Sequence, residues 1–184
     1  MKKILKNKEI NEQVWKDLKK VTLNGIKTTL ESAKILLEIN MRENEKFLID
    51  HPYISAGLVT YAVEEYGKLL ILQSYKPVNG KVTIEYKKLF RSHNEKFKTA
   101  LGNLPKKSKA IGKSIFDPAI FDPAVFDTKP PEPSFESRKS IFYSDLDEND
   151  NIKMMPYVDV KPLKRAIERF EKIIESISLD WLWN

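Results

Sequence analysis

Two glutamates and one lysine occur inside a segment whose other residues are typical of a buried helix. Between Ser55 and Tyr75, apolar residues recur at the spacing of an amphipathic helix, and Glu65 falls on the same stripe. Lys68 follows Glu64 by four residues and Glu65 by three, so its ammonium group can reach both carboxylates. Charged groups persist in a core only where they are paired. The spacing therefore indicates either an ion pair that braces a helical bundle or a polar site between helices.

A histidine and another lysine lie in a later segment with helical spacing. Apolar residues predict one helix from Ile84 to Leu104, with His93 on its inward stripe and Lys96 one turn away. The stripe consists of Tyr86, Leu89, Phe90, His93, Phe97, Ala100, Leu101 and Leu104. An inward histidine is more often a hydrogen-bonded core residue than a catalyst, unless its neighbours perturb it. We expect Glu65, Lys68 and His93 to form a buried network between two helices, so that replacing Glu65 with alanine destabilises the fold.

The sequence offers few ways to bind a metal ion or a cofactor. Either glutamate of the pair, together with His93, could ligate one metal ion, but the positive charge of Lys68 opposes a bound cation. HExxH and ExxH motifs, EF-hand loops and glycine-rich phosphate loops are absent from the sequence. The chain has no cysteine, which excludes thiolate ligands, disulfide bonds and cysteine nucleophiles. We therefore expect neither a metal nor a cofactor.

Length and composition set the size of the fold. The chain has 184 residues, of which 41% are hydrophobic, which suffices for one ordinary core but not for two. We expect a single domain over residues 1–184, in the all-α class, built as an antiparallel helical bundle. Six prolines between Pro105 and Pro133 exclude a long helix there and predict a proline-rich loop, residues 105–133, inserted into the bundle.

Helical periodicity places the elements of this bundle. A first helix is predicted from Glu9 to Phe47, with a bend or break at Asn24–Gly25. The second helix should end near Lys76–Pro77, and Val78 to Thr83 is predicted to be a loop because its flanks are short for strands. A last helix, with Asp159 as its N-cap and Pro162 in its first turn, closes the core through one apolar stripe. That stripe consists of Leu163, Ile167, Phe170, Ile174, Ile177 and Trp181.

Charge and hydropathy bear on the partners and location of the protein. The net charge is +6, but 32 basic residues are interspersed with 26 acidic ones, so composition favours a nucleic-acid partner only weakly. The first ten residues contain lysines, as the start of a secretory signal does, but no apolar stretch follows them. The sequence also has no run of about 18 apolar residues that could span a bilayer. We expect a soluble, cytoplasmic protein with no membrane partner.

The proline-rich loop carries a near-repeat of Phe-Asp-Pro. Phe116, Phe121 and Phe126 are five residues apart, a spacing that cannot line one face of a helix or strand. The lysines before them are Lys106, Lys107, Lys109 and Lys113. One interpretation is an arm that contacts an acidic or RNA surface or another protomer. The other is a surface loop whose phenylalanines pack on the bundle.

Three separated motifs resemble those of AbiV-type abortive infection proteins, and they occur in the same order as in that family. The EExGK motif of a helix consists of Glu64, Glu65, Gly67 and Lys68. The HxxK motif of a later helix consists of His93 and Lys96, and the RxxxxYxD element consists of Arg138, Tyr143 and Asp145. The resemblance covers the chain from about Leu23 to Pro156. AbiV-type proteins are similar to the wider HEPN group of helical bundles, which commonly dimerise and often cut RNA without a metal ion.

The resemblance implies a HEPN-like antiparallel bundle that forms a homodimer. Apolar residues in excess of one seam are expected in the interface, namely Trp15, Ile35, Trp181 and Trp183. HEPN ribonucleases carry an arginine that four to six residues separate from the histidine, whereas no such arginine precedes His93. Lys88 before His93 and Arg138 before Tyr143 are the nearest substitutes. Arg91 is two residues from His93 and would face elsewhere on a continuous helix.

Metal-free RNA cleavage requires a base for the ribose 2′-hydroxyl, a cation for the developing charge and an acid for the leaving oxygen. His93 could be base or acid and Tyr143 a second proton donor, with a cation from Lys68, Lys96 or Arg138. The candidate catalytic residues are Glu64, Glu65, Lys68, His93, Lys96, Arg138, Tyr143 and Asp145. We expect a phage-defence protein that cleaves RNA or blocks the translation machinery in infected cells. The alternative is a non-catalytic protein that binds a phage protein or RNA, with a purely structural polar cluster.

Overall fold

The computed structural model describes residues 7–42, 51–103, 160–177 and 181–182. Within these ranges the chain forms five helices and one pair of strands. In chain order they are β1 (Lys8–Asn11), α1 (Glu12–Arg42), α2 (His51–Ser74), β2 (Lys81–Ile84), α3 (Tyr86–Phe90), α4 (His93–Asn103) and α7 (Val160–Glu175). The prediction of an all-α fold is therefore confirmed in part: the described chain is mostly helical, with one small two-stranded sheet that was not predicted. The expectations for Asp159 and for the proline-rich loop, residues 105–133, lie outside the described residues.

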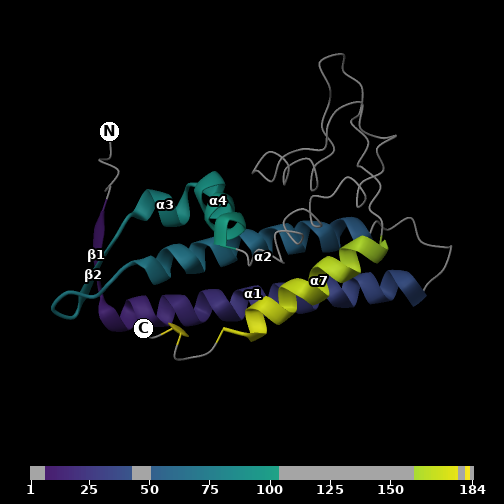
Figure 1. Cartoon of the computed structure of the whole chain (residues 1–184), viewed down its shortest axis with the longest axis horizontal. Coiled ribbons are helices and arrows are strands. Elements are labelled where there is room, and N and C mark those ends of the chain that lie inside the picture. The colour runs from purple at the N-terminus through teal and green to yellow at the C-terminus, as the bar shows by residue number, and fades with distance from the viewer. Residues whose placement is uncertain (1–6, 43–50, 104–159, 178–180, 183–184) are drawn as a thin grey trace, which may run out of the picture.

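The three long helices pack lengthwise against one another, as Figure 1 shows. α1 and α2 run in opposite directions, and α7 runs back along α1 while also contacting α2. α3 and α4 lie on the side of α2 away from α1. Apolar side chains of α1, α2, α4 and α7 share one core, so α2 is covered from several directions.

This central position explains the composition of α2. Its buried side chains lie on every face of the helix rather than on one stripe. The apolar ones are Ala56, Val59, Ala62, Val63, Tyr66, Leu69, Ile71 and Leu72, and the polar ones are Ser55, Thr60 and Glu64. The residue that faces a given neighbour therefore cannot be inferred from the apolar pattern of α2 alone.

The prediction of a loop from Val78 to Thr83 is wrong. β2 pairs with β1 in antiparallel register, with Ile10 opposite Val82 and Lys8 opposite Ile84. Asn79 and Gly80 have positive φ angles of 50° and 73°, as a tight two-residue turn requires. The pairing partner of β2 is β1, at the start of the described residues and about 70 residues earlier, so the short flanks of the turn do not show it. The first helix consequently starts at Glu12 instead of Glu9, and it continues through Asn24–Gly25 without a break.

The single helix predicted from Ile84 to Leu104 is also wrong, because the chain leaves the helix at Arg91 and Ser92. Leu89, Phe97 and Ala100 are buried as expected, whereas Tyr86 and Phe90 are 36% and 37% exposed. His93 becomes the first residue of α4 rather than a mid-helix position. A new helix start at this point changes which way His93 and its neighbours face.

The apolar stripe of the last helix is confirmed. Leu163, Ile167, Phe170 and Ile174 are at most 1% exposed, and Ile177 and Trp181 pack against the same core. The helix begins at Val160, so Pro162 stands in its first turn, where a missing N–H costs no helical hydrogen bond. None of the helices in the described ranges has the length and apolar character needed to cross a bilayer.

Candidate functional site

Gly67 brings α4 into close contact with α2. A Cβ atom at this position would overlap the backbone carbonyl of Lys96. Only glycine therefore allows the first turn of α4 to rest directly on α2. Because Glu64 is three residues before Gly67 on the same helix, this contact sets the first turn of α4 above the Glu64 side chain.

Glu64 is the centre of a buried polar cluster. Its Oε1 atom lies 2.5 Å from Nζ of Lys96 and 2.6 Å from Nδ1 of His93. Glu64 and Lys96 are 1% and 3% exposed, so both charges are shielded from water and each compensates the other. The cluster of Glu64, His93 and Lys96 joins the second and fourth helices by side-chain bonds as well as by packing.

His93 connects this buried cluster with the surface. Lys96 pairs with the carboxylate of Glu64, so we assign Nδ1 of His93 as the donor to Oε1. In the neutral tautomer with this donor the lone pair is on Nε2, and the side chain is 32% exposed. A carboxylate that fixes the tautomer of a partly exposed imidazole is an arrangement that supports proton transfer at Nε2.

The predicted network of Glu65, Lys68 and His93 needs correction. The carboxylate that meets His93 is that of Glu64, whereas Glu65 pairs with Lys68 along α2 at 2.9 Å. The side chains of Glu65 and Lys68 are 14% and 15% exposed, so this pair is partly buried, less completely than the pair of Glu64 and Lys96. Lys68 also lies over the ring of Phe90, 5.4 Å from its centroid. The site residues thus divide into a buried cluster and an adjacent, more accessible ion pair.

Of the other residues considered for the site, the structure describes Arg91 but not Arg138, Tyr143 or Asp145. Arg91 is exposed and lies outside any helix, so an argument from its angle on a continuous helix does not apply. Arg138, Tyr143 and Asp145 lie outside the described residues, and their approach to His93 stays a prediction.

A second buried polar group was missed in the sequence. Lys19 is 0% exposed, and its Nζ lies 3.4 Å from the Trp15 ring centroid and 3.0 Å from Oε1 of Gln73. Burial lowers the pKa of Lys19 to about 8, and the positive charges of Lys76 and Lys16 act in the same direction. Its four-residue spacing from Trp15 on the inward face of α1 was the available signal. This lysine is remote in sequence from the three motifs.

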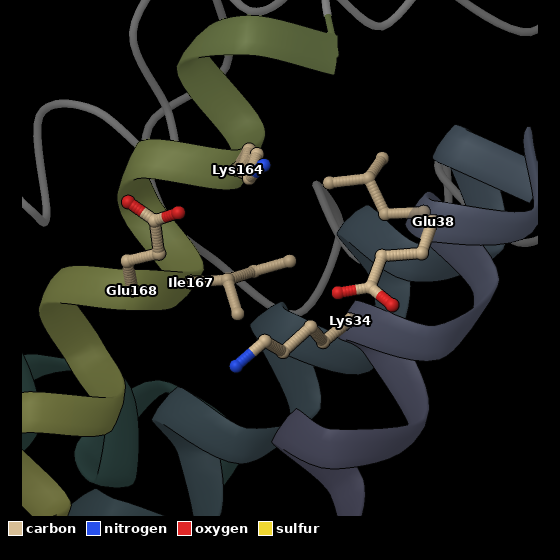
Figure 2. Close-up of a pocket in the computed structure, with 6 residues that line it drawn as sticks. Lys34, Glu38, Lys164, Ile167 and Glu168 are labelled. Atoms are coloured by element: carbon tan, nitrogen blue, oxygen red, sulfur yellow. The ribbon is translucent and has the colours of Figure 1, made fainter. Parts of the chain in front are cut away.

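An open hollow lies between α1 and α7, away from these clusters (Figure 2). Lys34 and Glu38 line it from α1, and Lys164, Ile167 and Glu168 line it from α7. Its two lysines and two glutamates balance in charge, so the hollow has no preference for a charged ligand. None of the predicted site residues lines it.

Neither a cluster of metal ligands among the described residues nor a known relative identifies the chemistry of this site. In the ranges that the structure describes, no three histidine, aspartate or glutamate side chains gather as ligands for a metal ion. The chain matches no model of a protein family, and it is similar to no curated protein and no solved structure at a significant level.

Proposed function

We propose that this chain is a phage-defence protein of the AbiV type that acts on RNA in infected cells, with His93 as its proton-transfer group. The observation that carries the proposal is the bond between Nδ1 of His93 and the buried carboxylate of Glu64. The resemblance of the EExGK and HxxK motifs to that family supports it, because Glu64, Gly67, His93 and Lys96 meet in space.

The proposed reaction is metal-independent cleavage of the RNA backbone. Nε2 of His93 removes the proton of a ribose 2′-hydroxyl, whose oxygen attacks the neighbouring phosphorus atom. The bond from phosphorus to the 5′-oxygen breaks, which leaves a 2′,3′-cyclic phosphate and a 5′-hydroxyl that takes its proton from water. His93 then releases the proton of the 2′-hydroxyl to water. Glu64 stabilises the imidazolium that forms. Lys68 stands near enough to the surface to bind the phosphate, whereas the ammonium of Lys96 is committed to Glu64.

The test is RNA cleavage by a His93→Ala variant. We expect its rate to fall by about 100-fold or more relative to wild type, which is the usual effect of removing a general base. Product ends are identified by mass spectrometry, and the reaction is repeated with a chelator, which should leave the rate unchanged. His51→Ala, at the only other histidine, is the control and should cut normally. A folded His93→Ala protein that cuts RNA at the wild-type rate would remove His93 from the mechanism.

A second candidate function is non-catalytic binding of a phage protein or RNA. The near-complete burial of Glu64 and Lys96 favours it, since an ion pair that braces two helices needs no substrate. This function requires that purified wild-type protein leave RNA intact and that His93→Ala cells keep their phage protection. The rate comparison above therefore separates the two functions.

We also propose a homodimer through the outer face of α1. Trp15, expected in the interface, is instead 1% exposed, and its indole N–H donates to the carbonyl of Leu72 at 2.8 Å. Val14, Val21 and Ile35 are 53%, 66% and 50% exposed at multiples of seven residues, which gives α1 an apolar outer row.

The proposed interface predicts the effect of new charges on molecular mass. Val21→Glu combined with Ile35→Glu should convert a dimer to a monomer, because four carboxylates would meet in one two-fold interface. Light scattering at micromolar concentration measures the mass. Val78→Glu, at an exposed turn position, is the control and should remain a dimer. A monomeric wild-type protein would contradict the proposal.

A further inference from the structure

An exposed aromatic pair lies beside the His93 cluster. Tyr86 and Phe90 stand one turn apart on α3, with ring centroids 4.9 Å apart and planes inclined by 38°. Leu89, at 0% exposure, anchors α3 in the core, while Tyr86 and Phe90 remain 36% and 37% exposed. Neither ring belongs to the buried core of the described residues, so α3 presents both rings at the surface.

Basic side chains flank the two rings. Lys87 and Arg91 are exposed and Lys88 is partly exposed, whereas Glu85 is the one acid between Ile84 and Asn94. Lys68 adds an ammonium group over the Phe90 ring, although it shares its charge with Glu65. The surface of α3 therefore combines aromatic faces with a local excess of positive charge.

This surface adjoins the proposed reaction site. Two residues, Arg91 and Ser92, separate α3 from His93 at the start of α4. Lys68 contacts the Phe90 ring and lies one turn after Glu64 on α2. A strand held by the rings can therefore extend to His93.

We propose that Tyr86 and Phe90 stack on the bases of a single-stranded RNA, while Lys87 and Arg91 bind its phosphates. Exposed rings among cations match the two repeating parts of a single strand, a flat base and a charged phosphate. A duplex buries its base faces in its own stack and lacks the first of these parts. The choice of RNA rests on the proposed function, whereas the stacking surface rests on the geometry of α3.

The test is fluorescence anisotropy with a short labelled single-stranded RNA. His93→Ala protein serves as the parent, so that the RNA stays intact during the measurement. Adding Tyr86→Ala and Phe90→Ala should weaken binding at least about tenfold, the scale of lost base stacking. Phe90→Leu keeps an apolar side chain without a ring and should weaken binding in the same direction. Val78→Ala, at an exposed turn position away from α3, should bind within about twofold of the parent, a change much smaller than the loss of one stacked base.

Salt dependence tests the phosphate contacts. Lys87→Ala with Arg91→Ala should reduce the slope of log affinity against log salt by about 1.4, at roughly 0.7 for each phosphate of a single strand. Lys164→Ala with Lys172→Ala removes the same charge from α7 and should leave the slope close to that of the parent.

Three results would overturn the inference. The first is that the variant without both rings binds as tightly as the parent. The second is that the parent binds duplex RNA as tightly as single-stranded RNA. The third is that the parent does not bind single-stranded RNA. Circular dichroism confirms that each variant is folded. If binding requires the rings but wild-type protein does not cut RNA, the proposed RNA cleavage is wrong and the stacking surface is still supported. If wild-type protein cuts RNA but the loss of both rings does not change its affinity for RNA, only the inference about base stacking is wrong.

Discussion

Replacing Glu64 with alanine is expected to lower the free energy of unfolding by about 3–5 kcal/mol, a large fraction of the stability of a domain of this size. The substitution leaves the ammonium of Lys96, 3% exposed, without the carboxylate that compensates its burial. It also removes the acceptor of the His93 Nδ1 proton. Urea unfolding followed by circular dichroism measures the change.

Glu65→Ala is the matched control for this prediction. The two glutamates are neighbours on α2, but the pair of Glu65 with Lys68 is only partly buried. Its loss should therefore cost less than that of the Glu64 cluster, about 1–2 kcal/mol. The combined change of Glu64→Leu and Lys96→Met should recover much of the stability, since it removes both buried charges together. If Glu65→Ala costs as much as Glu64→Ala, the cluster is assigned to the wrong glutamate.

The choice between these glutamates shows what the sequence could predict. Helical periodicity correctly predicted α1 and α7, since a long amphipathic pattern depends on local spacing alone. It also predicted a helix at α2, although the buried residues of α2 are not confined to one stripe. It also predicted that charges in the EExGK segment must be paired. It assigned the inward position to Glu65 because one stripe was assumed. α2 is buried on all faces, so several stripes fit equally well and only the position of α4 selects Glu64.

The interrupted third helix has a local signal that periodicity did not use. Ser92 directly precedes α4 and Glu95 occupies its third position, the residue types favoured at a helix start. Reading this pair as a start signal would have divided the helix at Ser92 and placed His93 in a first turn. The β1–β2 pair, by contrast, joins segments that are about 70 residues apart. Short strands with a distant partner leave no comparable local pattern.

Gly67 links the motif in the sequence to the geometry of the site. A glycine inside a long helix costs about 1 kcal/mol relative to alanine, so its presence calls for a reason in packing. The reason here is the backbone of α4, which occupies the space of a side chain. The same contact holds His93 and Lys96 over Glu64, so the spacing of glutamate and glycine in EExGK positions one proton-transfer group.

Gly67→Ala is therefore expected to destabilise the protein by at least about 3 kcal/mol, at the upper end of the cost of overpacking a core. The new methyl group meets a backbone carbonyl, which cannot rotate away as a flexible side chain does. α4 must shift as a unit, so RNA cleavage should fall together with stability. Gly25→Ala is the matched control, since its Cβ has nothing within 4 Å and should raise stability by about 0.5–1 kcal/mol. Opposite signs for these two substitutions in urea unfolding would support the close contact of α2 and α4, whereas a stabilising Gly67→Ala would refute it.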